Sequence, residues 1–152
     1  MIEIGLLGDK NLENMLRQLP NRGQKTAVNK ALRASAKRLR PKLAAATPVD
    51  QGRLKKAMEK AKIRAIKRRN QTGVGIALPM RAELGIPADA KGYYPTAIEY
   101  GFYSVRAGRM IPAQRFIRNT VDTERPTEIP AIGRDLGRAI TEQARKEAAK
   151  KH

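Results

Sequence analysis

The sequence contains no cysteine, and it is poor in histidine and aromatic residues. Without cysteine the chain has neither disulfides nor thiolate metal ligands. Its one histidine is the last residue, His152, which argues against a histidine general base, a Ser-His-Asp triad and a His-rich metal site. Aromatic residues make up 4% and tryptophan is absent, so we expect a modest core of Ala, Leu and Ile that favours helix pairs.

Long apolar runs and phosphate-binding loops are absent as well. The most apolar stretch, 73–80, is far shorter than the roughly 20 residues of a membrane-spanning helix. The N-terminus MIEIGLLGDK lacks a basic region followed by an apolar one, so we expect no signal peptide. No GxxxxGK[ST] loop occurs, and the carboxylates show no paired pattern. We therefore expect no enzyme activity, catalytic residue, cofactor or metal.

What the chain has in excess is positive charge, concentrated in one segment. Residues 22–69 contain 17 Lys/Arg and two acids, a net +15, whereas the other 104 residues carry only +3. Such a field attracts polyanions or acidic protein surfaces. A generally soluble basic surface is the alternative, although nearly balanced charge elsewhere makes it less favoured.

The longest helical pattern covers 24–46. A stripe through Val28, Leu32, Ser35, Leu39 and Leu43 is expected to be buried, while Pro41 predicts a kink or a break near 38–40. A second face, spaced by three and four residues, carries cations that we predict to contact a polyanion or an acidic partner: Lys30, Arg33, Lys37 and Arg40.

A β-hairpin is predicted for 60–69 with 73–79, because Val74, Ile76 and Leu78 alternate after a turn at 69–73. Its first strand carries further candidate contact residues, although the same cations would also protect an exposed strand edge from aggregation. These residues are Lys62, Arg64 and Arg68.

The remaining elements are shorter. We expect a strand at 2–7, a helix at 11–19, loops at 80–95 and 102–111, and a short helical or extended element at 96–100. A helix is expected from Pro112, and prolines 126 and 130 should interrupt it. The fold class is α+β: a small antiparallel sheet, including hairpin 60–79, packed against helix 24–46 and a C-terminal helix. The organisation predicted is a single domain, 1–152, with a C-terminal helical extension at about 127–152.

Three ordered segments resemble signatures of the tail-completion and head–tail joining proteins of long-tailed phages, the minor tail protein Z-like family. TPVDQGRL at 47–54 is similar to "A-P-V-D-T-G-R-L". AIEYG at 97–101 is similar to "Y-A-x-x-x-E-F-G", and IPAQRFIR at 111–118 is similar to "I-P-A-R-P-F-L-R-P-A". The resemblance covers roughly 24–145, and a virion-morphogenesis protein of contractile-tailed phages shares a similar last segment.

The resemblance assigns scaffold roles to the motif residues. Asp50 would cap a short helix, Gly52 would allow close packing and Leu54 would anchor that helix in the core. Phe116 would pack the C-terminal helix onto the sheet. In AIEYG, Glu99 is a candidate base by chemistry, but a capping or inter-element hydrogen bond is favoured; Gly101 closes the element.

The function that the resemblance implies is a structural virion protein of the neck. It would assemble in the host cytoplasm into a homo-oligomeric ring, expected to be a hexamer, joining the tail to the head connector around the DNA channel. Its neighbours would be the head connector or adaptor and the tail terminator or tail tube, with a non-specific contact to genomic DNA and none to membranes. The alternative from charge alone is a cytoplasmic, sequence-independent nucleic-acid-binding protein.

Overall fold

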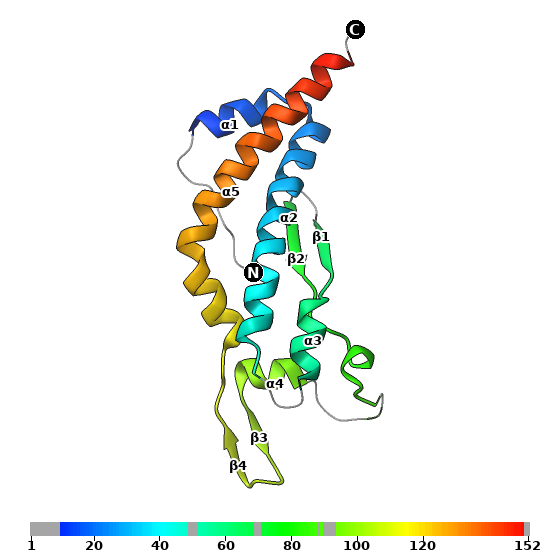
Figure 1. The fold of residues 1–152 in the computed structure, drawn as a ribbon, viewed down its shortest axis with the longest axis vertical. Helices are drawn as coiled ribbons and strands as arrows, with labels where there is room; N and C mark the ends of the chain where they lie inside the picture. The colour runs from blue at the N-terminus through cyan, green and yellow to red at the C-terminus, as the bar shows by residue number, and fades with distance from the viewer. Residues whose placement is uncertain (1–9, 49–51, 69–70, 88, 90–93, 151–152) are drawn as a thin grey trace. The chain divides into compact units, whose positions relative to one another are not determined.

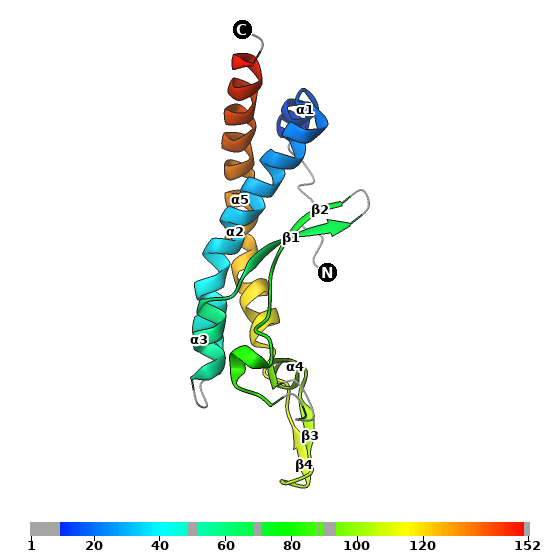
Figure 2. The same cartoon turned by 90° about the vertical axis from the view of Figure 1, so that its right-hand side faces the viewer.

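The structure is a computed structural model that describes residues 10–48, 52–68, 71–87, 89 and 94–150. The strand expected at 2–7 lies outside these residues. Figure 1 and Figure 2 show the described elements in two views. In chain order they are α1 Lys10–Arg17, α2 Asn21–Ala46, α3 Arg53–Glu59, β1 Ile63–Arg68, β2 Gln71–Ile76, the 3-10 helix η1 Ala82–Leu84, α4 Tyr94–Tyr100, β3 Phe102–Ser104, β4 Arg109–Ile111 and α5 Phe116–Ala149.

The α+β prediction is confirmed. Two antiparallel two-stranded sheets, β1–β2 and β3–β4, accompany the long helix α2 and the C-terminal helix α5. The predicted hairpin 60–79 is present with shorter strands, and its ladder is continued by the Ala77 N–H, which donates to the Lys62 carbonyl at 2.9 Å. The loop expected at 80–95 contains η1, and the element at 96–100 belongs to α4.

The chain forms two compact units. The first contains Met1–Lys37, Ile63–Gly75 and Arg125–His152, and the second contains Arg38–Lys62 and Ile76–Glu124. Both α2 and α5 therefore contribute residues to each unit. The single domain expected from the sequence stays a prediction.

The core of the first unit joins α1, α2 and α5. Ala27 and Ala31 of α2 are buried in one cluster with Leu136 and Ile140 of α5. Leu19, just after the end of α1, is buried in the same cluster. Alanine lets helix backbones approach closely, as the sequence predicted for a core poor in aromatic residues. The segment expected as a C-terminal extension thus supplies half of this core.

The interruptions predicted at prolines 126 and 130 are wrong, and so is a break at Pro41; a kink near 38–40, the other outcome expected there, stays a prediction. α2 runs through Pro41, and α5 runs through Pro126 and Pro130. A proline inside a helix costs about 3 kcal/mol, so neighbouring turns must be held by other contacts. In α5, the turn between the two prolines is held by the buried Glu128 carboxylate, which accepts a 2.9 Å hydrogen bond from the Ser35 hydroxyl.

Two helix starts also differ from the prediction. α2 begins at Asn21, three residues early, because Pro20 can precede a helix and its carbonyl accepts the Gln24 N–H at 3.0 Å. α5 begins at Phe116 instead of Pro112. The residues before it are occupied in contacts with α4, described below.

The loop expected at 102–111 is a second hairpin. β3 and β4 pair in the register Phe102↔Ile111, Tyr103↔Met110 and Ser104↔Arg109. Its strands are three residues long and exposed at two of the three positions. They carry no apolar–polar alternation, which is the signal by which a strand is recognised in sequence.

Candidate interaction site

The three motif segments meet in the core of the second unit. Leu54 from 47–54, Ile98 from 97–101 and Phe116 from 111–118 are all buried in one cluster. The other buried members come from α2, α3 and η1: Leu43, Ala44, Met58 and Leu84. Leu54 and Phe116, which are 62 positions apart in the sequence, are therefore parts of one local scaffold.

Leu54 anchors α3 in this core, as expected. Phe116 is buried in a cluster that is mainly helical, and its packing onto the sheet stays a prediction. Among the described residues, the sheets contribute the half-buried Ile76. Burial of one aromatic side chain at the first residue of α5 fixes where that helix leaves the core.

Glu99 joins the second and third motifs. Its side chain is only 6% exposed, and its carboxylate oxygens accept the N–H groups of Ile117 at 2.9 Å and Arg118 at 3.0 Å. Both N–H groups lie in the first turn of α5, where no helical carbonyl can accept them. The negative charge also suits the positive end of the helix dipole. The interpretation of Glu99 as a capping, inter-element group is confirmed.

Main-chain contacts reinforce this joint between α4 and α5. The Gln114 N–H donates to the Ile98 carbonyl at 2.9 Å, and the Arg115 N–H donates to the Glu99 carbonyl at 3.2 Å. Arg115 has a positive φ of 48°, which turns the chain immediately before Phe116. Residues before α5 are thus hydrogen-bonded to α4, which explains why the helix starts late.

Gly101 lies where the chain passes close to itself. Its φ is +79°, and a Cβ there would be 2.8 Å from the Ile111 carbonyl oxygen and 2.9 Å from the Ala113 nitrogen. No side chain fits between these backbone atoms. The glycine that closes AIEYG is therefore required by geometry at the base of hairpin β3–β4.

The first motif differs from its expected geometry. Asp50 lies outside the described residues, and the residue before α3 is Gly52, which makes no side-chain cap. Gly52 has a φ of +70°, but a Cβ there would meet nothing within 4 Å. A left-handed backbone, and not close packing, is the reason for glycine at this position.

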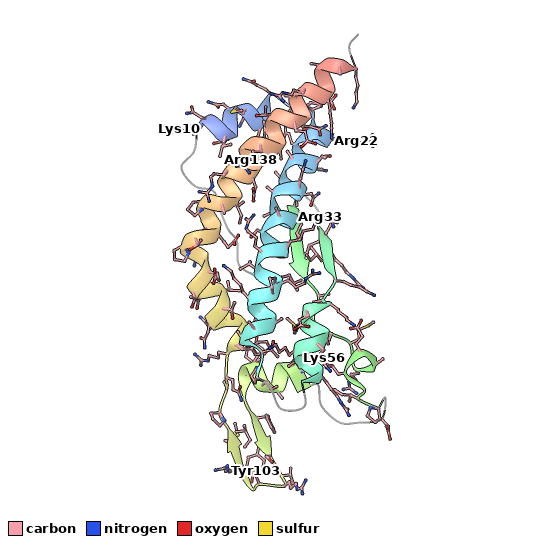
Figure 3. All side chains as sticks on the ribbon, in the orientation of Figure 1. Lys10, Arg22, Arg33, Lys56, Tyr103 and Arg138 are labelled. Carbon is pink, nitrogen blue, oxygen red and sulfur yellow. The ribbon has the colours of Figure 1, made fainter. Side chains whose placement is uncertain are left out.

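Hairpin β3–β4 exposes apolar side chains. The exposed fractions are 59% for Tyr103, 87% for Val105 and 64% for Met110, and Tyr100, at the end of α4 just before the hairpin, is 77% exposed. Figure 3 shows Tyr103 at the far end of the hairpin, away from α3 and α4. No acid occurs between Glu99 and Asp122, while this stretch contains Arg106, Arg109, Arg115 and Arg118.

The basic residues predicted as a contact surface divide between the two units. Lys30, Arg33, Lys37, Arg64 and Arg68 belong to the first unit, whereas Arg40 and Lys62 belong to the second. The Lys30 ammonium is paired with Glu142 of α5. The half-buried Arg40 donates to the Ala61 carbonyl at 3.3 Å.

Four residues of the predicted set remain available for contact. Arg33, Lys37, Lys62 and Arg64 are exposed, and the structure gives them no ion pair with any described residue. The side chain of Arg68 lies outside the described part. Figure 3 places Arg33 on α2 and Arg138 on α5; the arginines of α5 were not among the residues predicted from the sequence.

Among the described residues, the carboxyl group of Glu142 has the pKa that departs most from its ordinary value. Hydrogen bonds from Lys30 and Lys146 lower the pKa of Glu142 from 4.5 to about 2. This carboxylate is ionised at all but strongly acidic pH. Its pairs favour the folded state above its ordinary pKa, and that contribution is lost as the pH falls from about 4.5 toward 2.

We expect Lys30→Ala to raise the pKa of Glu142, because the lysine hydrogen bond is the largest cause of the depression. A carboxyl-carbon NMR titration from pH 1.5 to 7 measures the midpoint directly. Lys25→Ala, an exposed cation on the same helix, is the control and should leave the midpoint unchanged. Equal midpoints in wild type and Lys30→Ala would show that the pair does not form in solution.

Two further structural findings concern the described residues alone. Within them, no three His, Cys, Asp or Glu side chains gather as a potential metal site. None of their helices combines the length and apolarity needed to cross a membrane. Comparison of the chain with protein-family models, with curated proteins and with solved structures found no significant match.

Proposed function

We propose that this chain is a structural protein of the phage neck, which joins the tail to the head connector and uses hairpin β3–β4 to dock onto a neighbouring protein. One observation carries the proposal. The segments that resemble the tail-completion family form the joint at Glu99 and Gly101. The exposed apolar hairpin β3–β4 begins directly after this joint. The described motif residues serve as scaffold, which suits a structural role.

The hairpin has the composition of a protein-binding element. Interface cores are enriched in tyrosine, methionine and arginine, and a few anchors supply most of the binding energy. Tyr103, Val105 and Met110 are exposed anchors of this kind. Arginines 106 and 109 flank them without a neighbouring acid, so the partner surface that fits is an apolar pocket with a carboxylate rim.

The proposal includes a homo-oligomeric ring, expected to be a hexamer, around the DNA channel. A chain of net charge +18 repels its own copies in solution. We therefore expect the ring to form on the acidic surface of the head connector or tail terminator, and the isolated chain to be smaller in native mass spectrometry at low salt.

Tyr103→Ala/Val105→Ala tests the proposal. Both side chains are exposed, so the variant should fold normally. In host cells carrying the phage with this gene disrupted, we expect the wild-type chain to restore joined particles. The double variant should instead leave separate heads and tails, counted by electron microscopy.

Met15→Ala, which truncates an exposed apolar side chain of α1, is the control and should restore assembly. Mass spectrometry of purified particles gives the second readout, in which the chain should be found. The proposal is overturned if particles lack the chain, or if the double variant joins heads to tails as efficiently as wild type.

A further inference from the structure

α5 presents a row of arginines on the face opposite its buried residues. Arg134, Arg138 and Arg145 are separated by four and seven residues, which places them on one side of a helix. All three are exposed. With Thr141 and Gly137 they line an open hollow of about 600 Å³ in the first unit. We call these three residues the arginine row.

The charge of the arginine row is not neutralised within the described chain. None of the three guanidinium groups has an ion pair there. The one acid that lines the hollow, Glu142, is already bonded to Lys30 and Lys146. The hollow therefore has an excess of positive charge that packing does not explain.

Gly137 is also among the residues that line the hollow. Glycine inside a helix costs about 0.5–1 kcal/mol relative to alanine. Packing does not demand it here, because a Cβ would lie 3.5 Å from Leu12 Cδ2, an ordinary contact.

The chemistry of the hollow favours phosphate over a protein partner. Planar guanidinium groups bind phosphate through paired hydrogen bonds, whereas the Thr141 hydroxyl already donates to the Gly137 carbonyl at 3.0 Å. The lining contains no large apolar or aromatic side chain that could anchor a protein. Interfaces with nucleic acid are, by contrast, polar and strongly positive.

The length of the arginine row also suits a nucleic-acid backbone. Eleven residues at a rise of about 1.5 Å cover about 16 Å of helix. One strand of a DNA duplex carries a phosphate for every roughly 3.4 Å of its axis, so several phosphates lie within that length. Three arginines can each reach a separate phosphate.

We infer that the arginine row of α5 is a sequence-independent binding site for the phosphate backbone of double-stranded nucleic acid. It lies apart in sequence from the basic segment 22–69 and does not depend on the docking role of the hairpin. The contact proposed is to phosphate oxygens, which are the same at every base pair and carry no sequence information.

The test is fluorescence anisotropy with a 24-base-pair random DNA duplex between 50 and 300 mM NaCl. Arg134→Gln/Arg138→Gln/Arg145→Gln removes three contacts, so the slope of log K against log salt should fall by about 2 to 3. Affinity at 0.1 M salt should fall on the order of 100-fold. Hairpin variant Tyr103→Ala/Val105→Ala should bind as wild type.

Lys25→Gln/Lys56→Gln/Lys60→Gln is the matched control, because it removes the same charge from exposed positions on α2, α3 and the end of α3. It should change the slope by less than 1. Equal slopes for the two triple variants would overturn the inference, as would absence of duplex binding at 50 mM salt. Displacement of the duplex by polyglutamate at equal charge concentration would overturn it in favour of an acidic protein.

Discussion

Replacing Gly101 by alanine is expected to destabilise the protein by about 3 kcal/mol. A residue other than glycine in the left-handed region costs about 1–3 kcal/mol. Here the new Cβ would also lie 2.8 Å and 2.9 Å from the backbone of Ile111 and Ala113. Backbone atoms cannot move aside as a flexible side chain can, so the start of α5 must shift. Urea unfolding followed by circular dichroism measures the loss.

Gly108→Ala separates the two causes. Gly108 also has a positive φ, +62°, but a Cβ there would meet nothing within 4 Å. Gly108→Ala should therefore lower the free energy of unfolding only by the cost of a left-handed backbone at alanine, about 1 kcal/mol. Both substitutions stiffen the unfolded chain alike, so that effect cancels between them. Equal losses in the two variants would mean that the close approach at Gly101 does not exist in solution.

This joint marks the limit of what sequence reasoning could predict. Apolar spacing was enough to find α2, because this helix buries one face and leaves a periodic pattern. The first hairpin was found from its alternation and turn residues, although Ile66 in β1 is 41% exposed. The hydrogen-bonding role of Glu99 was also predicted, since a lone acid between apolar residues usually satisfies a nearby donor. Its partners, Ile117 and Arg118, could not be, because contacts 18 residues apart leave no local pattern.

The rule that proline interrupts a helix gave way to tertiary contacts. A kink or a break was expected at Pro41 and interruptions at prolines 126 and 130, but α2 and α5 run through them, and the Ser35–Glu128 hydrogen bond holds the turn between the last two. The contact surface predicted within 22–69 stays a prediction, and four of its cations are exposed without an ion pair to any described residue. The arginine row of α5 was missed because the acids in its own part of the sequence offset its charge in the count.

Glu99→Ala is expected to cost about 3 kcal/mol. It removes the acceptor of two N–H groups at the start of α5, and each unsatisfied buried donor costs about 1–3 kcal/mol. Water cannot replace the carboxylate fully, because Glu99 is 6% exposed. Glu99→Gln keeps one acceptor oxygen but turns an amide N–H₂ toward the second donor, so it should recover no more than half of the loss. Urea unfolding measures both.

Glu83→Ala is the matched control for that substitution. Glu83 also accepts a backbone N–H, from Met80 at 2.7 Å, but at an exposed position, where water replaces the lost acceptor. Its loss should stay below about 1 kcal/mol. Amide exchange should accelerate at Ile117 and Arg118 in Glu99→Ala and stay unchanged there in Glu83→Ala. Similar stability losses in both alanine variants would contradict a buried cap.

Glu99→Ala should also weaken docking by hairpin β3–β4. The hairpin lies between Gly101 and the residues to which Glu99 is hydrogen-bonded, so loss of these bonds loosens its base, even though Glu99 is too buried to touch a partner.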